Sequence, residues 1–281
     1  MEVEKTIDAI RSRVRDARRA GRTIGLVPTM GALHTGHYSL IRTAREGCDY
    51  LVVSIFVNPT QFGPGEDYAN YPRSMDEDLA GCENCGVDAV FAPGVEDMYP
   101  EKPLTTVSVS RLTETLCGSR RPGHFDGVCT VVAKLFNIVQ PDRAWFGTKD
   151  YQQLVVVRRM SEDLNFPVEV LSCPTVREQD GLAVSSRNAY LTSDERRQAP
   201  ALYAALQDAR RIVEQKHPSA EEVIDVLRRR ISADAPDGKL DYAQVVDPHT
   251  LKDVEETDRP VVIAAALYLG KARLIDNVRV D

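Results

Sequence analysis

The sequence predicts an α/β protein with a Rossmann-like parallel sheet domain and a smaller C-terminal α+β domain. Two observations carry this prediction. Strand-length apolar runs alternate with amphipathic helical segments up to about residue 175, which is typical of an open parallel sheet. Beyond residue 177 two helical segments precede three strand-like runs that are spaced as an antiparallel meander. We therefore expect domains over residues 1–175 and 176–281.

Composition excludes several classes of protein. The chain has 281 residues, 43% of them hydrophobic, and a formal net charge of −7, so it can bury a large core but lacks the basic character of most nucleic-acid-binding proteins. No stretch approaches the roughly 20 apolar residues needed to span a bilayer. Six cysteines scattered through apolar segments indicate reduced thiols. We expect a cytoplasmic protein that binds neither nucleic acid nor membrane.

The elements of the first domain follow from hydrophobic spacing and from Gly, Pro and Ser signals. The expected order is a helix over 3–20, a strand over 23–27, a helix after residue 37, a strand over 50–57, a helix over 75–85, a strand over 87–91, a weaker strand over 106–109, a helix over 128–139, a strand over 144–146, a helix over 150–164 and a strand over 168–171. Residues 58–73 and 117–127 are predicted to be loops. Ser74 and Glu77 have the spacing of a capping box.

The second domain is expected to begin with a polar loop. A charged helix carrying Leu202, Ala205 and Ile212 comes next, and a second helix runs from Ser219 to Ile231. Strands over 242–246, 261–268 and 273–278 close the chain.

One decapeptide combines the features of a phosphate site. Pro28-Thr29-Met30-Gly31-Ala32-Leu33-His34-Thr35-Gly36-His37 lies between an apolar run and an amphipathic one, so it reads as strand, Gly-rich turn and helix. Unsatisfied N–H groups at a helix start attract anions, and imidazole can donate a hydrogen bond to a phosphate as negative charge shifts. The four residues from His34 to His37 alone are also compatible with a helix cap or a chance metal-binding pair.

A second turn of this kind is Gly147-Thr148-Lys149-Asp150, at the end of one predicted strand and the start of a helix. Its N–H groups and the Lys149 ammonium can face a phosphate, while Asp150 can hold a ribose hydroxyl. Both turns follow strands, where open α/β sheets bind their ligands.

Several strings carry a family resemblance. The HxGH tetrad from His34 to His37 resembles that of the nucleotidyltransferase superfamily, which includes the class I aminoacyl-tRNA synthetases. The whole decapeptide is far more specific and resembles the pantoate–β-alanine ligase family. The same resemblance extends to Phe56-Val57-Asn58-Pro59-Thr60-Gln61-Phe62, Lys149-Asp150-Tyr151-Gln152-Gln153 and Ser185-Ser186-Arg187-Asn188. It spans essentially the whole chain.

The resemblance implies an ATP-dependent ligase. In that family ATP activates pantoate to an enzyme-bound pantoyl adenylate with release of diphosphate, and β-alanine then attacks to give pantothenate and AMP, a step of coenzyme A biosynthesis. The implied catalytic residues are His37, His34, Lys149 and Arg187. The implied ATP-binding residues are Met30, Gly31, Ala32, Leu33, His34, Thr35, Gly36, His37, Gly147, Thr148, Lys149, Asp150, Val176, Val184, Ser185, Ser186 and Arg187.

The resemblance also implies the remaining ligands. The substrate-binding residues are Pro28, Thr29, Met30, Asn58, Gln61, Tyr71 and Gln153, with Gln61 expected to meet β-alanine as well as pantoate. Glu77 and Asp78 stand where some members place acidic ligands for Mg²⁺, although carboxylates in a helix's first turn are also favoured by the macrodipole alone. Arg121 and His124 lie in a loop that could touch substrate. A homodimer and a lid formed by residues 176–281 are also expected.

Three positions depart from the family pattern, and two alternatives stay open. Thr35 and Thr148 stand where Glu is frequent or usual, and Val184 stands where Met is common. The first alternative is an adenylyltransferase that acts on a different acid or nucleotide. In that case an acceptor other than pantoate would drive pyrophosphate exchange. A nucleotide-sensing or scaffold protein without turnover is the second, and it would bind ATP without releasing pyrophosphate.

Overall fold

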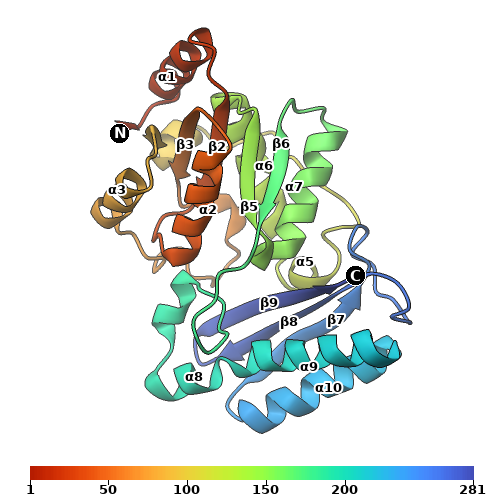
Figure 1. The fold of residues 1–281 in the computed structure, drawn as a ribbon. Coiled ribbons are helices and arrows are strands. Elements are labelled where there is room, and N and C mark those ends of the chain that lie inside the picture. The colour runs from red at the N-terminus through yellow and green to blue at the C-terminus, as the bar shows by residue number, and fades with distance from the viewer. The chain divides into compact units, whose positions relative to one another are not determined.

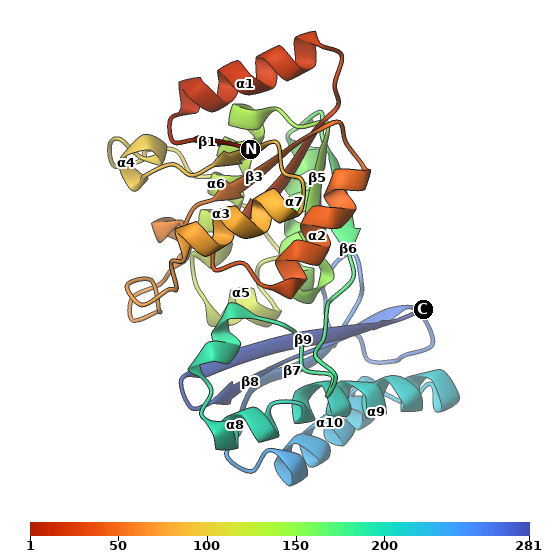
Figure 2. The same cartoon turned by 60° about the vertical axis from the view of Figure 1, so that its left-hand side comes forward.

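The computed structural model describes residues 1–281, which form two compact units. The first comprises residues 1–110, 121–148 and 153–174, and the second comprises residues 111–120, 149–152 and 175–281. Figures 1 and 2 show the elements of both units from two directions. None of the helices combines the length and apolar character needed to cross a membrane.

The first unit is built on a six-stranded parallel sheet with the order β1-β4-β3-β2-β5-β6. The strands are β1 (Glu2–Glu4), β2 (Ile24–Thr29), β3 (Tyr50–Ile55), β4 (Ala89–Phe91), β5 (Arg143–Gly147) and β6 (Glu169–Cys173). Every residue of β3 is buried, as expected for a parallel strand covered on both faces. The predicted fold class, a Rossmann-like parallel sheet with a smaller α+β part, is confirmed.

The helices of this unit lie on both faces of the sheet (Figure 1). They are α1 (Ile7–Arg19), α2 (Thr35–Glu46), α3 (Met75–Asn84), α4 (Val95–Met98), α6 (His124–Val139) and the part of α7 (Tyr151–Asp163) from residue 153 onward, with the short 3₁₀ turn η1 (Pro59–Gln61). Of the 3₁₀ turn η2 (Thr148–Asp150), only Thr148 belongs to this unit. Leu40, Ile41 and Ala44 of α2 are buried in a core that includes Val53 and Trp145 of the sheet. The apolar stripe that predicts this helix therefore faces the strands.

The strand order reverses direction between β2 and β5. From β2 the chain moves outward through β3 to β4, and β5 then returns to the other side of β2 before β6. The register pairs Gly25 of β2 with Arg143 of β5, so Thr29 and Gly147, four residues further on, end their strands at the same level. This is a topological switch point, where open α/β sheets bind ligands beyond the strands' carboxyl ends.

All six cysteines are free and buried, as the sequence predicts. Burial raises the pKa of Cys82 and of Cys129 to about 12, and that of Cys48 to about 11. These thiols are therefore neutral in the folded protein near pH 7 and act as small apolar groups.

The second unit contains an antiparallel meander covered on one face by two helices. Its sheet has the order β7-β8-β9, and the strands are β7 (Lys239–Val246), β8 (Val261–Leu269) and β9 (Ala272–Val280). The helices are α5 (Leu116–Arg120), α8 (Ser193–Gln198), α9 (Ala201–Lys216) and α10 (Ala220–Asp234), and there is one 3₁₀ turn, η3 (Ser186–Tyr190). Leu206 of α9 and Leu227 of α10 share one core with Ile263 of β8. Ser219 caps α10 in a reciprocal pair with Glu222, which is a capping box.

Two segments predicted to lie in the first domain belong to the second unit instead. Residues 111–120 and 149–152 cluster with residues 175–281, so the division differs from a single cut after residue 175. Gln152 explains part of this, because its buried amide donates to the carbonyls of Leu112 and Thr115, both at 2.8 Å. Sequence spacing gives no sign of such an amide bridge.

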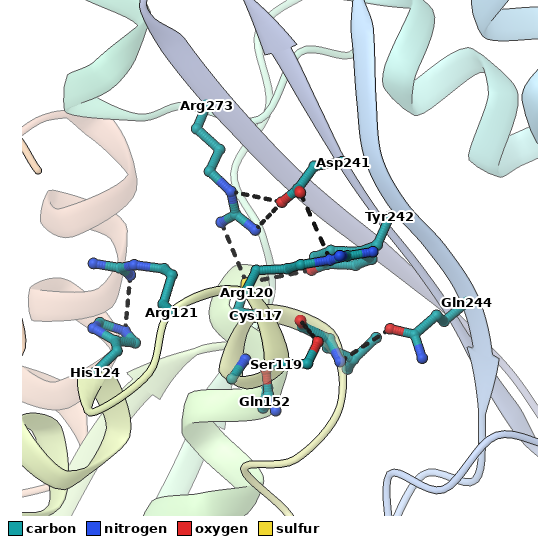
Figure 3. A network of polar contacts seen from close by, with 12 residues as sticks. Cys117, Ser119, Arg120, Arg121, His124, Gln152, Asp241, Tyr242, Gln244 and Arg273 are labelled. Atoms are coloured by element: carbon teal, nitrogen blue, oxygen red, sulfur yellow. Dashed lines mark hydrogen bonds and ion pairs between the residues drawn. The ribbon is translucent and has the colours of Figure 1, made fainter. Parts of the chain in front are cut away.

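A polar network fastens α5 to the meander (Figure 3). The Cys117 thiol lies 3.3 Å from the Tyr242 hydroxyl, and Arg273 donates to Asp241 through Nε and Nη2 at 3.0 and 2.7 Å. The N–H of Leu116 donates to the side chain of Gln244 at 3.0 Å. Burial, with Cys117 beside it, raises the pKa of Tyr242 well above its ordinary value, so the phenol remains a neutral partner in this network.

Several predicted elements are wrong. Residues 2–4 form a strand that pairs with β4, rather than the start of α1. Residues 106–109 form no strand, since Val107 donates its N–H to the Thr130 side chain of α6 instead of to a neighbouring strand. The expected loop over 117–127 contains α5 and the first turn of α6, and the polar segment before α9 contains α8.

Candidate active site

The turn between β2 and α2 needs an unusual backbone. Gly31 and Ala32 both have positive φ, +81° and +50°, a region that glycine enters freely and alanine only under strain. The buried hydroxyl of Thr29 donates to the Ser54 carbonyl at 2.7 Å and accepts from the N–H of Gly31 at 3.2 Å. The turn is therefore tied to β3, the neighbouring strand.

The two histidines stack at the start of α2. Their ring centroids are 4.0 Å apart with planes inclined by 28°, and Nδ1 of His37 faces the N–H of His34 at 3.4 Å. When Nδ1 accepts that hydrogen bond, a neutral His37 ring carries its proton on Nε2. A donor nitrogen thus stands beside the first N–H groups of a helix, an arrangement suited to an anion.

The other residues of the decapeptide surround these rings. Pro28, Met30, Leu33 and Gly36 are half-buried, whereas Thr35 is exposed at the first position of α2.

The Asn58–Gln61 loop meets the decapeptide within the first unit. Nε2 of Gln61 lies 3.0 Å from the sulfur of Met30, and Oε1 accepts from the buried amide of Asn58 at 3.1 Å. The side-chain oxygen of Asn58, Oδ1, accepts from the hydroxyls of Thr60 and Tyr99 at 2.9 and 3.0 Å. The Asn58 amide also donates to the Gly127 carbonyl at 3.1 Å. Asn58 therefore holds Gln61, and its donors and its oxygen are all engaged within the protein, with none left for a substrate.

Gly127 lets the loop approach α6. A Cβ at this position would lie 2.4 Å from the Thr60 carbonyl oxygen and 2.6 Å from the backbone of Gln61. Only glycine fits such a close approach. The sequence offers no local signal for this role, because the glycine stands inside a helix.

Arg121 and His124 hold the backbone of Gln61. Nδ1 of His124 lies 2.8 Å from the Gln61 carbonyl oxygen and Nε2 lies 2.9 Å from Arg121 (Figure 3). Arg121 also donates to both oxygens of Glu66 at 2.7 and 2.6 Å. Burial raises the pKa of Glu66, but the hydrogen bonds and charge of Arg121 outweigh it and keep that pKa below its ordinary value. These residues thus position the loop of Gln61.

Tyr71 is buried at the end of the same loop, with its ring edge-to-face on Phe62 at a centroid distance of 5.9 Å.

Of the two residues expected to bind Mg²⁺, Asp78 does not fit that role. Asp78 is 1% exposed, and its two oxygens accept from the N–H groups of Ala32 and Leu33 at 2.8 and 2.7 Å. The Ser74 hydroxyl donates to the same carboxylate at 3.2 Å instead of capping α3, so the predicted capping box with Glu77 is wrong. Glu77 is exposed, and no group of three or more His, Cys, Asp or Glu side chains is arranged around a metal position.

The second phosphate turn follows β5. Gly147 and Thr148 are half-buried and belong to the first unit, as does Gln153 near the start of α7. Gly147 ends its strand level with Thr29, so the two predicted phosphate turns begin at the same edge of the sheet.

Lys149 and Asp150 belong to the second unit. The Lys149 ammonium lies 3.9 Å from the Asp150 carboxylate. The Lys149 carbonyl accepts from the side chain of Asn277 on β9 at 2.9 Å, so the meander fixes the backbone of this turn.

A hairpin carries the last predicted ATP-binding residues. Val184 donates its N–H to the Val176 carbonyl at 3.0 Å, and Arg177 pairs with Ala183. Ser185 then caps the 3₁₀ turn by accepting from the N–H of Arg187 at 3.3 Å, and Ser186 opens that turn. The structure therefore brings Val176, Val184, Ser185, Ser186 and Arg187 onto one continuous loop.

The base of this hairpin is held by an ion pair that no sequence pattern predicts. Arg177 donates to both oxygens of Asp276 on β9 at 2.5 and 2.9 Å, and its guanidinium lies 3.6 Å from the centroid of the Tyr203 ring. The Asp276 side chain is 3% exposed. Arg177 and Asp276 are 99 residues apart in the sequence, so no local pattern predicts that they pair.

Comparisons with known proteins agree over the whole chain. The profile of the family Pantoate-beta-alanine ligase matches residues 2–279. Pantothenate synthetase of Moorella thermoacetica is 54% identical over 278 residues, which cover 99% of this chain and 98% of that protein. Pantothenate synthetase of Thermotoga neapolitana is 52% identical over 277 residues, 99% of each.

Solved structures agree as well. Pantothenate synthetase from Thermus thermophilus has a TM-score of 0.94 at 48% identity, with 99% of both chains covered. Pantoate-beta-alanine ligase from Francisella tularensis, complexed with Beta-gamma ATP and β-alanine, has a TM-score of 0.78 at 34% identity, covering 99% of this chain and 97% of that one. This chain belongs to the pantoate-beta-alanine ligase family.

Proposed function

We propose that the protein condenses pantoate with β-alanine at the expense of ATP, giving pantothenate, AMP and diphosphate through an enzyme-bound pantoyl adenylate. The observation that carries this proposal is the stacked His34–His37 pair at the start of α2. The pair lies at the switch point of the sheet, and the chain belongs to this ligase family. The turn offers helix N–H groups and an imidazole to a phosphate.

In the first step a pantoate carboxylate oxygen attacks the α-phosphorus of ATP. The new bond joins that oxygen to phosphorus, and the bond to the β-phosphate oxygen breaks with release of diphosphate. His37 donates from Nε2 to the α-phosphate as negative charge accumulates there, and His34 packs beside it. Such donors act through positioning and charge stabilisation, without a covalent intermediate on the protein.

The cations Lys149 and Arg187 neutralise the phosphates during this transfer. Asp150 accepts from a ribose hydroxyl. The residues assigned to the nucleotide are Met30, Gly31, Ala32, Leu33, His34, Thr35, Gly36, His37, Gly147, Thr148, Lys149, Asp150, Val176, Val184, Ser185, Ser186 and Arg187.

In the second step the β-alanine amine attacks the acyl carbon of the adenylate. A C–N bond forms, the bond from the acyl carbon to the phosphate oxygen breaks, AMP leaves and the amine loses a proton. Gln61 and Gln153 bind pantoate, and Gln61 also accepts from the incoming amine, because an amide both donates and accepts. Pro28, Thr29 and Met30 complete the pocket for the acid, while Asn58 and Tyr71 hold the loop of Gln61 in place.

Mg²⁺ accompanies the phosphates of ATP in this proposal. The cation favours oxygen ligands and keeps several waters, but the oxygens of Asp78 are engaged by backbone N–H groups. Asp78 is therefore not assigned as its ligand, and Glu77, which is exposed, remains the proposed carboxylate.

The protein acts as a homodimer in the cytoplasm under the same proposal. Six free buried thiols are typical of a reducing compartment. Light scattering at working concentration gives the assembly directly, and a mass of one chain contradicts the dimer.

The reaction is tested with purified protein, ATP, Mg²⁺, pantoate and β-alanine. We expect AMP, diphosphate and pantothenate in equal amounts, and no AMP when pantoate is left out. AMP formation driven by another acid in place of pantoate supports a different adenylyltransferase. ATP binding without AMP formation under any of these conditions supports a protein that senses nucleotides, and either result contradicts the proposal.

A further inference from the structure

Asp78 was expected to bind Mg²⁺, but its carboxylate is buried and accepts hydrogen bonds from backbone N–H groups. It lies in the first turn of α3, 1% exposed, where the helix alone would favour a negative charge at the surface. Its oxygens instead point to the neighbouring turn, Oδ2 accepting from the N–H of Ala32 at 2.8 Å and Oδ1 from that of Leu33 at 2.7 Å. A buried carboxylate with two consecutive backbone donors is a brace on that backbone.

The backbone that Asp78 holds is the strained part of the decapeptide. Ala32 has a φ of +50°, a left-handed conformation that alanine adopts only under strain. Such strain persists only where the surroundings over-determine it. A Cβ on Gly31 would lie 2.9 Å from Oδ2 of Asp78 and 3.1 Å from Ile55, so the carboxylate is packed tightly against the turn.

We propose that Asp78 is a positioning residue that holds Ala32 and Leu33 in the left-handed turn from which His34 and His37 enter α2, and that it is not a metal ligand. Resting on the proposed function, this assigns Asp78 an effect on the adenylation step through the placement of the two imidazoles. A misplacement of about 1 Å at such a site can cost about a hundredfold in rate.

Asp78→Asn tests the brace with almost no change of size. One amide oxygen can still accept one N–H, but the amide nitrogen then faces the other N–H, donor against donor. We expect kcat for pantoate-dependent AMP formation to fall at least tenfold while KM for β-alanine stays within twofold. Asp76→Asn is the matched control, since it removes the same charge from the exposed face of the same helical turn, and we expect it to leave kcat within twofold.

A second substitution separates a brace from a metal ligand. Ala32→Gly removes the left-handed penalty, so the double variant Asp78→Asn/Ala32→Gly is expected to recover about fivefold of the lost kcat. The Mg²⁺ concentration that gives half the maximal rate is expected to be unchanged in Asp78→Asn. Recovery of the rate by added Mg²⁺, with no effect of Ala32→Gly, overturns the proposal.

Amide hydrogen exchange keeps this test independent of turnover. The amides of residues 31–34 are expected to exchange at least tenfold faster in Asp78→Asn than in the unmodified protein or in Asp76→Asn, and equal protection overturns the brace. If the unmodified protein forms no AMP, the proposed function fails. Amide hydrogen exchange still shows in that case whether Asp78 braces the turn. If Asp78→Asn does not fold, Gly31→Ala displaces the same carboxylate from the turn side, and a kcat equal to that of the unmodified protein contradicts the proposal.

Discussion

His37→Ala is expected to lower kcat for pantoate-dependent AMP formation by about 100- to 1,000-fold, because it removes the donor assigned to the α-phosphate. The ring is half-buried at the start of α2 and stacks on His34 at 4.0 Å. Because α2 is anchored in the core by Leu40, Ile41 and Ala44 and not by this ring, we expect the helix to form without it. Steady-state kinetics with unchanged far-UV circular dichroism is the measurement.

Two further variants sharpen this result. His37→Gln carries an amide donor near the position of Nε2 and is expected to retain more activity than His37→Ala. His249→Ala removes an exposed imidazole of the second unit and is expected to leave kcat within twofold. A kcat of His37→Ala within threefold of the unmodified protein contradicts the assigned role.

Asp276→Ala is expected to lower the free energy of unfolding by about 3–5 kcal/mol, because it leaves the Arg177 guanidinium without its carboxylate at a largely buried site. The expected loss includes two hydrogen bonds, at 2.5 and 2.9 Å. Urea unfolding followed by circular dichroism at 222 nm reports on α9 and α10, which pack on this sheet.

The exposed pair Arg197–Asp194 is the matched control. Asp194→Ala is expected to change the free energy of unfolding by less than about 1 kcal/mol, as for most surface ion pairs. The double variant Asp276→Ala/Arg177→Met is expected to be more stable than Asp276→Ala, because it no longer buries an unpaired charge. A loss for Asp276→Ala no larger than that for Asp194→Ala contradicts this account of the hairpin base.

The sequence predicts the strands and helices whose signals are local. The continuous apolar run of β3 and the stripe of Leu40, Ile41 and Ala44 on α2 are properties of a few neighbouring residues, and both elements form where expected. The strand over residues 2–4 was missed because its pairing with β4 joins segments more than eighty residues apart. Short edge strands carry little pattern of their own.

The same distinction holds for the candidate site. The turn of His34 and His37 is a contiguous string, so its place between β2 and α2 follows from the sequence. The role of Asp78 does not, because the N–H groups that it accepts from lie 46 and 45 residues away. A carboxylate in the first turn of a helix looks the same in sequence whether it binds a cation, faces solvent or braces a distant loop.

Exchange of labelled diphosphate into ATP tests the central claim most directly, because it isolates the formation of the adenylate from its consumption. With ATP, Mg²⁺ and pantoate present and β-alanine absent, we expect label to enter ATP at a rate that rises with pantoate concentration and falls about 100-fold or more in His37→Ala. Exchange that proceeds without pantoate, or that begins only when β-alanine is added, contradicts a pantoyl adenylate formed at this site.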